Sequence, residues 1–454
     1  MKKSILLIAL FALIGCDNQI NDVATSVNTE KITLSTSEYI SISSDDNSEI
    51  SDDKIVDIIS SFMDCNIPKS RSVNMHIRKR GFLQNQQNVK GYLFNNFVQK
   101  IPVCEVTIEN QSNKNTALVC TDSRFPFIYA FYEDDKEEKE TTPTYDLLIK
   151  SSEEIVMSQI NQIEQLKDSL KAPTLKKIAA KLSIDTNEIT FNKIRDRIII
   201  SNNLTRSKIV DEGTVDKDSG LAKYGPYISV RWDCGMPYNR NLPQSCPENW
   251  LWDERYVVNS CVVSIAQILS FYKPSVNAQG ITIDWDYLCK NQEIHEESDY
   301  FGSYVQDPIK RREMIGSLMK YIGDQCEVMY TCSGSSIYLS KIESFFSRFG
   351  IKVSRTQTMN LNILKDGLDN IHPVLVSGST NSNQSHWWVV DGYSTKVATR
   401  GDTFFPGFYV YFHANMGQGK SYTGYYLAGS DGTLTFDASF AHFTKNFNLY
   451  TLSK

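Results

Sequence analysis

The sequence predicts an α+β protein with more than one folded part, and three observations support this. The chain has 454 residues, which is too long for one ordinary domain and suits two or three. Hydrophobic residues make up 41% of it and aromatic residues 11%, which is ample for packed cores. In the C-terminal half, segments with helical periodicity come before strand-like runs, and this order is typical of α+β folds.

Charge and composition exclude some classes of function. The net charge of −6 is small for this length, and nothing resembles the basic footprint of a nucleic-acid-binding protein. There is no CxxC pair, and no histidine lies close to a cysteine pair, so the sequence predicts no metal site. We also expect no cofactor.

The N-terminus has the form of an export signal over residues 1–16, MKKSILLIALFALIGC. Two lysines precede an apolar run that is too short to span a bilayer as a stable helix. The end of the run resembles a bacterial lipobox, which implies that Cys16 is lipidated and becomes the mature N-terminus. The alternative is an ordinary signal peptide that ends by chance at a cysteine. We therefore expect an exported lipoprotein anchored at the bacterial outer membrane or cell surface, with a polar tether over residues 17–53.

Residues 54–213 are predicted to form a small α+β domain. Strand-like runs occur in NVKGYLFNN, PVCEVTIEN, TALVCTD and FPFIYAFYE. A helix is predicted over residues 151–170, where Ser151 and Glu154 fit a capping box. Its apolar face contains Val156, Ile160 and Ile163. Residues 214–226 are rich in Gly, Asp and Lys and are predicted to be a linker.

Residues 227–454 are predicted to form a second domain. Its first helical run is NSCVVSIAQIL, with Cys261 near the start. Two further helix faces are formed by Ile315, Leu318, Met319 and Ile322 and by Leu339, Ile342, Phe346 and Phe349. Strand-like runs follow in PVLVSG, SHWWVVDGYST, GFYVYFHANMGQG and YTGYYLAG. Because alternate strand residues point to opposite faces, at least one of Trp387 and Trp388 is expected in the core.

Export would place the cysteines in an oxidising compartment. Ten cysteines less Cys16 leaves nine, an odd number, so at least one thiol is left over. Closeness in the chain suggests the bridges Cys104–Cys120, Cys234–Cys246 and Cys326–Cys332. Sequence alone does not fix this connectivity.

Cys261 and His386 together suggest nucleophilic chemistry, although each alone is more often structural. A thiol attacks as the thiolate, and the N-terminus of a helix lowers the pKa of a thiol through its free N–H groups and positive dipole end. A nearby imidazole completes the ion pair and then donates its proton to the leaving group. His386 heads the strand-like run HWWVVDG, which suits a helical half that faces a β-rich half.

Four segments resemble the streptopain-like cysteine peptidases, namely RWDCGMPYN, NSCVVSIAQIL, SHWWVVDGY and HANMGQGKSYTGYY. The resemblance covers roughly residue 227 to the C-terminus. It implies a papain-like fold that acts on proteins or peptides. It also implies that residues 54–213 are an inhibitory prodomain, an intramolecular partner released by a cut in the linker 214–226. Carried over by position, Cys261 is the nucleophile, His386 the general acid/base and Asn415 the group that orients the imidazole.

Several positions depart from the family pattern. Cys234 stands where the family usually has Gln, Ser385 where it has Gly, and Met416 and Gln418 where it has Trp. The spacing also differs, because Gln267 follows Cys261 by six positions and the family spacing is seven. An ungapped match puts Ser260 in the nucleophile position, and one residue turns a helix by about 100°. We favour Cys261, since a slip just before the first helical turn is easier to absorb than one inside it.

Three functions remain open from the sequence. The first is a lipid-anchored cysteine endopeptidase made as a zymogen. The second is a non-catalytic binding protein that keeps the fold, which follows if Ser260 holds the nucleophile position. The third and weaker one is another papain-fold activity, such as acyl transfer or amidase chemistry.

Overall fold

The computed structural model describes residues 30–43, 49–66, 73–83, 100–109, 114–133, 143–201, 214–216, 221–247, 254–297, 305–332, 334–357, 361–379, 385–397, 408–430 and 448–454. The predicted signal peptide and Cys16 lie outside the described residues. Among the helices in these ranges, none is both long enough and apolar enough to cross a lipid bilayer.

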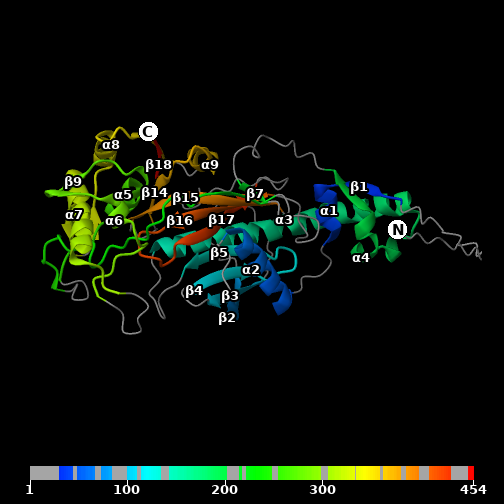
Figure 1. Cartoon of the computed structure of the whole chain (residues 1–454). Helices are drawn as coiled ribbons and strands as arrows, with labels where there is room; N and C mark the ends of the chain where they lie inside the picture. The colour runs from blue at the N-terminus through cyan, green and yellow to red at the C-terminus, as the bar shows by residue number, and fades with distance from the viewer. Residues whose placement is uncertain are drawn as a thin grey trace, which may run out of the picture.

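The described strands fall into an N-terminal and a C-terminal set. The N-terminal set is β2 (Asn74–Leu83), β3 (Ile101–Glu109), β4 (Lys114–Cys120) and β5 (Ile128–Glu133). The C-terminal set is β7 (Thr214–Asp216), β8 (Leu221–Tyr224), β13 (Lys352–Thr356), β14 (Val374–Ser379), β15 (Ser385–Val397), β16 (Phe408–Asn415), β17 (Gly424–Ser430) and β18 (Asn448–Ser453). Both sets belong to one sheet of twelve described strands (Figure 1).

This sheet joins the two predicted domains. Its order is β13-β18-β14-β15-β16-β17-β5-β4-β3-β2, with β8 paired to β15 and β7 to β8. The junction is the antiparallel pair β17–β5, in which Gly424 lies opposite Tyr132 and Tyr426 opposite Ala130. A side chain at Gly424 would meet the backbone of β5, because a Cβ there would stand 2.2 Å from the Phe131 carbonyl oxygen. The two strands therefore approach more closely than any other residue at this position would allow.

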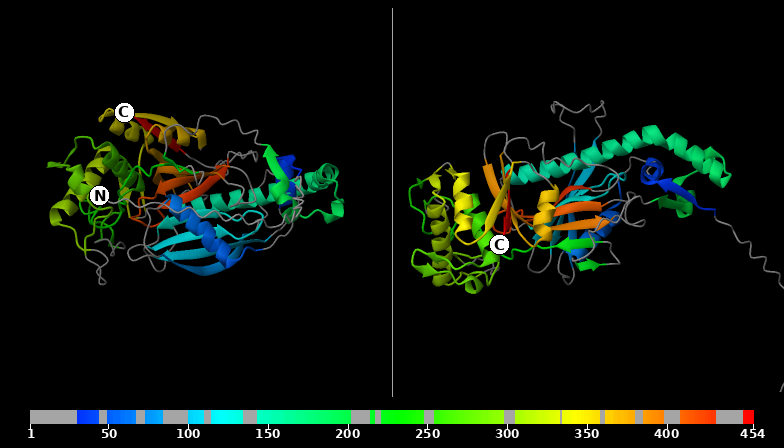
Figure 2. Two further views of the ribbon diagram at one scale, coloured as in Figure 1. Left: turned by 45° about the vertical axis from the view of Figure 1, so that its right-hand side comes forward. Right: turned by 90° about the horizontal axis from the view of Figure 1, so that it is seen from above.

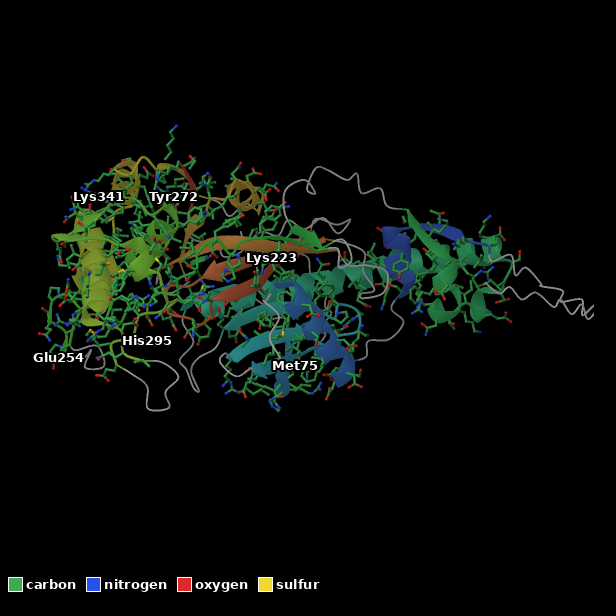
Figure 3. The ribbon with its side chains drawn as sticks, viewed as in Figure 1. Met75, Lys223, Glu254, Tyr272, His295 and Lys341 are labelled. Atoms are coloured by element: carbon green, nitrogen blue, oxygen red, sulfur yellow. A yellow bond between two sulfur atoms is a disulfide. The ribbon has the colours of Figure 1, made fainter. Side chains whose placement is uncertain are left out.

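Helices cover the sheet unequally. α5 (Ser260–Tyr272), α6 (Trp285–Leu288), α7 (Ile309–Gln325) and α8 (Leu339–Ser347) gather at one end, with the short hairpins β9 (Asn277–Ala278)–β10 (Ile281–Thr282) and β11 (Met329–Thr331)–β12 (Gly334–Ser336). α9 (Leu361–Asp369) lies near β18. α2 (Asp52–Asn66) and α3 (Pro143–Leu182) belong to the N-terminal part. Figure 3 shows the same division, with Glu254 and Lys341 at the helical end and Met75 on β2. The predicted α+β architecture, a helical half beside a β-rich half, is confirmed.

Two large apolar clusters lie against this sheet. One cluster contains side chains of both parts of the chain, since the Phe62 ring of α2 lies 5.1 Å from that of Tyr411 on β16 and 5.4 Å from that of Phe131 on β5. The other fills the space between the sheet and α5, α7 and α8. Trp388 belongs to the first cluster and Trp387 to the second, as alternation along a strand requires. Both tryptophans are therefore core residues.

The predicted tether over residues 17–53 is wrong for its described part. β1 (Ile32–Ser35) pairs in parallel with β6 (Ile198–Ser201), and α1 (Thr36–Ser43) follows it. This segment folds because its few apolar residues are buried. They are Ile32, Leu34, Tyr39, Ile40 and Ile42. With the end of α3, η1 (Thr186–Glu188), α4 (Phe191–Ile194) and η2 (Arg195–Arg197), these segments form a small separate unit (Figure 2).

Two other predicted boundaries also change. α3 begins at Pro143 and ends at Leu182, so Ser151 lies inside the helix and does not cap it. The buried face of Val156, Ile160 and Ile163 is confirmed. The predicted linker 214–226 contains β7 and β8, because Leu221–Tyr224 pairs with β15 and the Tyr224 ring stacks on Tyr393 at 4.7 Å.

The three predicted disulfides are wrong. The structure joins Cys246 to Cys332, 86 residues apart in the chain, and leaves Cys104, Cys120 and Cys326 as buried thiols. Cys104 lies opposite Val119 on the next strand, so Cys120 points to the other face of the sheet. Cys332 follows β11 directly and is carried by that hairpin to the segment before α5. Pairing thus follows the tertiary fold and not closeness in the chain.

Candidate active site

The first residue of α5, Ser260, contacts the histidine strand. Asn259 caps the helix, and its side-chain oxygen accepts a hydrogen bond from the Cys261 N–H at 2.8 Å. The Ser260 Oγ accepts a hydrogen bond at 3.2 Å from the backbone N–H of Trp387, the residue after His386. The serine hydroxyl therefore lies beside β15 at the point where His386 is held.

The thiol of Cys261 lies in the apolar core. The residue has 0% exposed surface and belongs to the cluster between the sheet and α7. Burial raises the pKa of this thiol well above its ordinary value, and the neighbouring Cys326 thiol adds to the rise. Because successive residues on a helix point about 100° apart, α5 directs Ser260 to β15 and Cys261 inward. The predicted nucleophile is thus a buried, protonated thiol in this structure.

His386 is a half-buried residue near the start of β15. Its Nε2 lies 3.1 Å from the backbone carbonyl oxygen of Met416. A carbonyl can only accept, so Nε2 carries the proton and Nδ1 keeps the lone pair. Burial lowers the pKa of His386 to about 4, and the Met416 carbonyl only partly opposes this. The ring is therefore neutral at physiological pH, which is unlike the imidazolium of a thiolate–imidazolium pair.

We expect this lowered pKa to make the protein less stable in mild acid. The unfolded ring takes up a proton near its ordinary pKa of 6.5, whereas the folded ring stays neutral until about pH 4. The stabilisation contributed by the neutral His386 ring is thus fully present above pH 6.5. It is lost as the pH falls from 6.5 to about 4. One pKa unit corresponds to about 1.4 kcal/mol, and partial solvent access to the ring reduces the total for the whole shift. We therefore expect the free energy of unfolding to fall by roughly 2 kcal/mol. Urea unfolding at pH 7 and pH 4.5 measures it, with His386→Gln as control. If the free energy of unfolding changed equally with pH in the original chain and in His386→Gln, the prediction would be wrong.

The amide of Asn415 is bonded to the scaffold. Its Oδ1 accepts from Gln267 Nε2 at 2.8 Å, and its Nδ2 donates to the Val230 carbonyl oxygen at 2.8 Å. Asn415 is fully buried at the end of β16 and thereby ties α5 to the segment before the helix. In the described structure the His386 ring bonds instead to the carbonyl of the next residue, Met416. Gln267 and this carbonyl are contacts that the sequence analysis missed.

A short loop, residues 416–423, carries Met416 and Gln418 at the two positions where tryptophan was expected. The Met416 side chain is buried in the cluster shared by both parts of the chain. Gly419 has φ +63°, and a Cβ there would stand 2.7 Å from a carboxylate oxygen of Glu293. The backbone N–H of Lys420 donates to the same carboxylate at 3.0 Å. The loop is thus shaped by backbone contacts and not by large rings.

Cys234, which stands at the expected glutamine position, is only partly buried. Its carbonyl oxygen accepts from the Val258 N–H at 3.0 Å, so the segment lies beside the N-terminal approach to α5. A cysteine side chain supplies no amide donor for an oxyanion. At the start of α5 the Cys261 N–H already donates to Asn259 Oδ1 at 2.8 Å.

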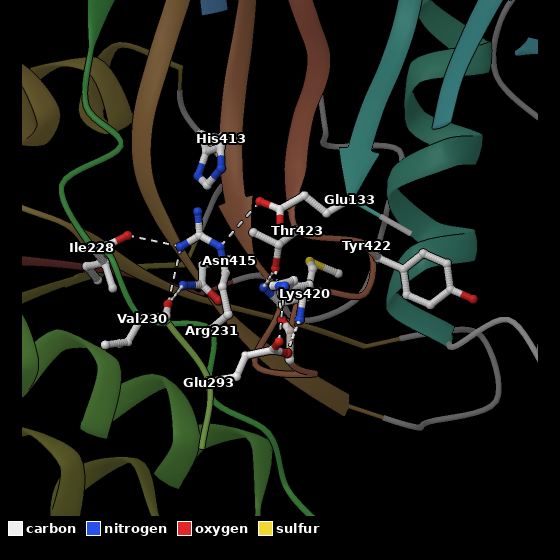
Figure 4. A network of polar contacts seen from close by, with 12 residues as sticks. Glu133, Ile228, Val230, Arg231, Glu293, His413, Asn415, Lys420, Tyr422 and Thr423 are labelled. Carbon is white, nitrogen blue, oxygen red and sulfur yellow. Dashed lines mark hydrogen bonds and ion pairs between the residues drawn. The ribbon is translucent and has the colours of Figure 1, made fainter. Parts of the chain in front are cut away.

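Asp391 and His413 form a buried pair deeper in the sheet. His413 Nδ1 lies 2.6 Å from Asp391 Oδ1, and the other carboxylate oxygen accepts from the Ile228 N–H at 3.1 Å. Nearby, the Arg231 guanidinium donates to the carbonyls of Ile228 and Val230 and lies 3.7 Å from the Glu133 carboxylate (Figure 4). These contacts hold the segment before α5 against both parts of the sheet.

No group of three or more metal-ligating side chains with suitable geometry occurs among the residues that the structure describes. The described site contains the Ser260 hydroxyl, which accepts from the Trp387 N–H, and the neutral imidazole of His386.

Comparison with known proteins adds one match. Residues 232–426 match the model of the Peptidase C10 family, so the match begins just before Cys234 and ends within β17. It includes Ser260, Cys261, His386 and Asn415. A search of curated proteins found no match.

Proposed function

We propose that the chain, whose residues 232–426 match the cysteine peptidases of the Peptidase C10 family, binds proteins or peptides in the family's manner without hydrolysing them. The observation that carries the proposal is the placement of Ser260 at the histidine strand while Cys261 is buried in the core. This arrangement corresponds to the ungapped match of the nucleophile helix, with a serine where the family has its cysteine.

The chemistry of the site supports the loss of hydrolysis. A serine hydroxyl is a much weaker acid than a thiol, so it needs a strong and well-oriented base. The lowered pKa of His386, about 4, makes the ring a weak base. Its Nε2 bonds to a backbone carbonyl, which stabilises the charge of an imidazolium less than a carboxylate does. We therefore expect bound peptides to remain intact.

An active zymogen is the second candidate, favoured by the family match itself. In this reading Cys261 attacks the peptide bond, His386 transfers protons and Asn415 orients the ring. Residues 54–213 inhibit the enzyme until a cut falls within 214–226. This reading requires the first turn of α5 to rotate, since the Cys261 thiol is fully buried.

Export and anchoring through Cys16 are proposed for either candidate. The disulfide Cys246–Cys332 supports this, because disulfides persist in oxidising compartments and are rare in the cytosol. The predicted site is the bacterial outer membrane or the cell surface.

Incubation with unfolded casein tests the proposed function. We expect purified chain, both intact and cut within residues 217–220, to bind fluorescent casein and to release no fragments over a day. The matched controls are Cys261→Ser and His386→Ala, which should leave this result unchanged. Fragment release that disappears in Cys261→Ser would contradict the proposal and establish the zymogen.

A further inference from the structure

We propose that the end of β5 and Thr423 act together as a positioning element for His386, so that the N-terminal part of the chain completes the histidine site. This inference goes beyond the proposed function, because it applies whether Ser260 or Cys261 is the nucleophile. Thr423 is a positioning residue in this account, since it acts on the imidazole through Met416.

The first link joins β5 to the end of the loop that follows Asn415. The Glu133 N–H donates to the Thr423 carbonyl oxygen at 2.9 Å, and the Tyr422 N–H donates to the Glu133 carbonyl oxygen at 3.1 Å. The adjacent residue, Gly424, already pairs with Tyr132 in the sheet. The position of residues 422–424 is therefore fixed by backbone contacts with the N-terminal part.

The second link is the hydroxyl of Thr423, which is fully buried. Its Oγ1 accepts from the Met416 N–H at 3.3 Å and lies 3.5 Å from the Gly419 carbonyl oxygen. One side chain thus ties together the start, the middle and the end of the loop. A valine has the same shape as threonine and can make neither contact.

The third link is the Met416 carbonyl, which accepts the Nε2 proton of His386 at 3.1 Å. The N–H and the carbonyl of Met416 belong to one residue, so a shift of its N–H moves the acceptor of the ring as well. Glu293 holds the middle of the same loop through Lys420. The loop therefore has two supports, one from β5 and one from the helical half.

These contacts indicate what would happen to the loop and to the His386 ring without β5. If β5 separated from β17, the Tyr422 N–H and the Thr423 carbonyl would lose their partners next to buried residues. An unsatisfied buried polar group is unfavourable, so the loop would rearrange toward water. The Met416 carbonyl would move with it, and the His386 ring would gain solvent.

Titration of the His386 ring by NMR in the full chain, with 13C-labelled histidine, tests this inference. His386→Gln assigns the resonance. In Thr423→Val we expect the His386 pKa to rise by about one unit toward its ordinary value, because the ring becomes better solvated. Thr423→Ser keeps the hydroxyl and should restore the original titration. Thr107→Val is the matched control, since Thr107 is a buried threonine on β3 away from the loop.

A second variant acts on β5 itself. In Gly424→Ala the new Cβ would stand 2.2 Å from the Phe131 carbonyl and 2.5 Å from the Tyr132 Cα, so it forces β5 away from β17. Gly81→Ala is its control, because Gly81 on β2 has nothing within 4 Å of the added Cβ. We expect the His386 resonance to shift in Gly424→Ala only. If Gly424→Ala does not fold, the His386 titration in Thr423→Val alone tests the inference. A folded Thr423→Val protein with the original His386 titration and unchanged amide exchange at Met416 would overturn the inference.

Discussion

Replacing Ser260 with cysteine is expected to create a thiol that reacts with iodoacetamide at least about 100-fold faster than Cys261 does in the folded chain. The new sulfur would lie at the first turn of α5, beside the backbone of β15 next to His386. A helix N-terminus lowers the pKa of a thiol, and thiolate is the reactive form. Cys261 is buried, and its own pKa is raised. Peptide mapping by mass spectrometry after timed labelling measures both rates.

Two further variants make this result specific. Cys261→Ser in the Ser260→Cys background should leave the fast labelling unchanged, whereas His386→Ala in that background should slow it. Cys289 provides an internal reference, because it is a half-buried thiol whose pKa burial raises to about 11. Labelling of residue 260 no faster than that of Cys289 would refute the assignment of the nucleophile position.

Removal of the Cys246–Cys332 disulfide is expected to lower the free energy of unfolding by about 4 kcal/mol. The bond closes a loop across 86 residues, and a loop of this length is much restricted in the unfolded chain. It also holds the β11–β12 hairpin near α5, where Asn259 Nδ2 donates to Ser335 Oγ at 2.8 Å. Urea unfolding of the double variant Cys246→Ala, Cys332→Ala measures the loss.

Cys289→Ala is the control for this experiment, since Cys289 is not in a disulfide and is only half-buried. It should cost less than about 1 kcal/mol. The addition of reductant to the original chain should reproduce the effect of the double variant. A loss below about 1 kcal/mol in the double variant, or a mapped bridge between Cys234 and Cys246, would contradict the structure.

Local periodicity was enough to predict the helices and strands that carry the site. α5, the buried face of α7 and the strand that begins near His386 follow from the spacing of apolar residues. The alternation of Trp387 and Trp388 between two clusters follows from the same rule. Which residue at the start of α5 bonds to β15 did not follow, because Ser260 and Cys261 are adjacent and both fit a helix start.

Long-range contacts were not predictable from a single sequence. Nothing in FPFIYAFYE or YTGYYLAG specifies that β5 pairs with β17, although this pair joins the two parts of the chain. The same limit applies to Cys246 and Cys332. They are 86 residues apart in the chain, and only the folded β11–β12 hairpin brings Cys332 to Cys246. The small unit built on β1 and α1 was missed because its apolar segments are only a few residues long.

Labelling of the unmodified, folded chain with iodoacetamide tests the central claim most directly. If Ser260 holds the nucleophile position, mass spectrometry will find Cys261 unmodified in the folded protein and modified only after unfolding. Rapid modification of Cys261 in the folded chain, lost in His386→Ala, would contradict the claim and show that the thiol reaches the imidazole.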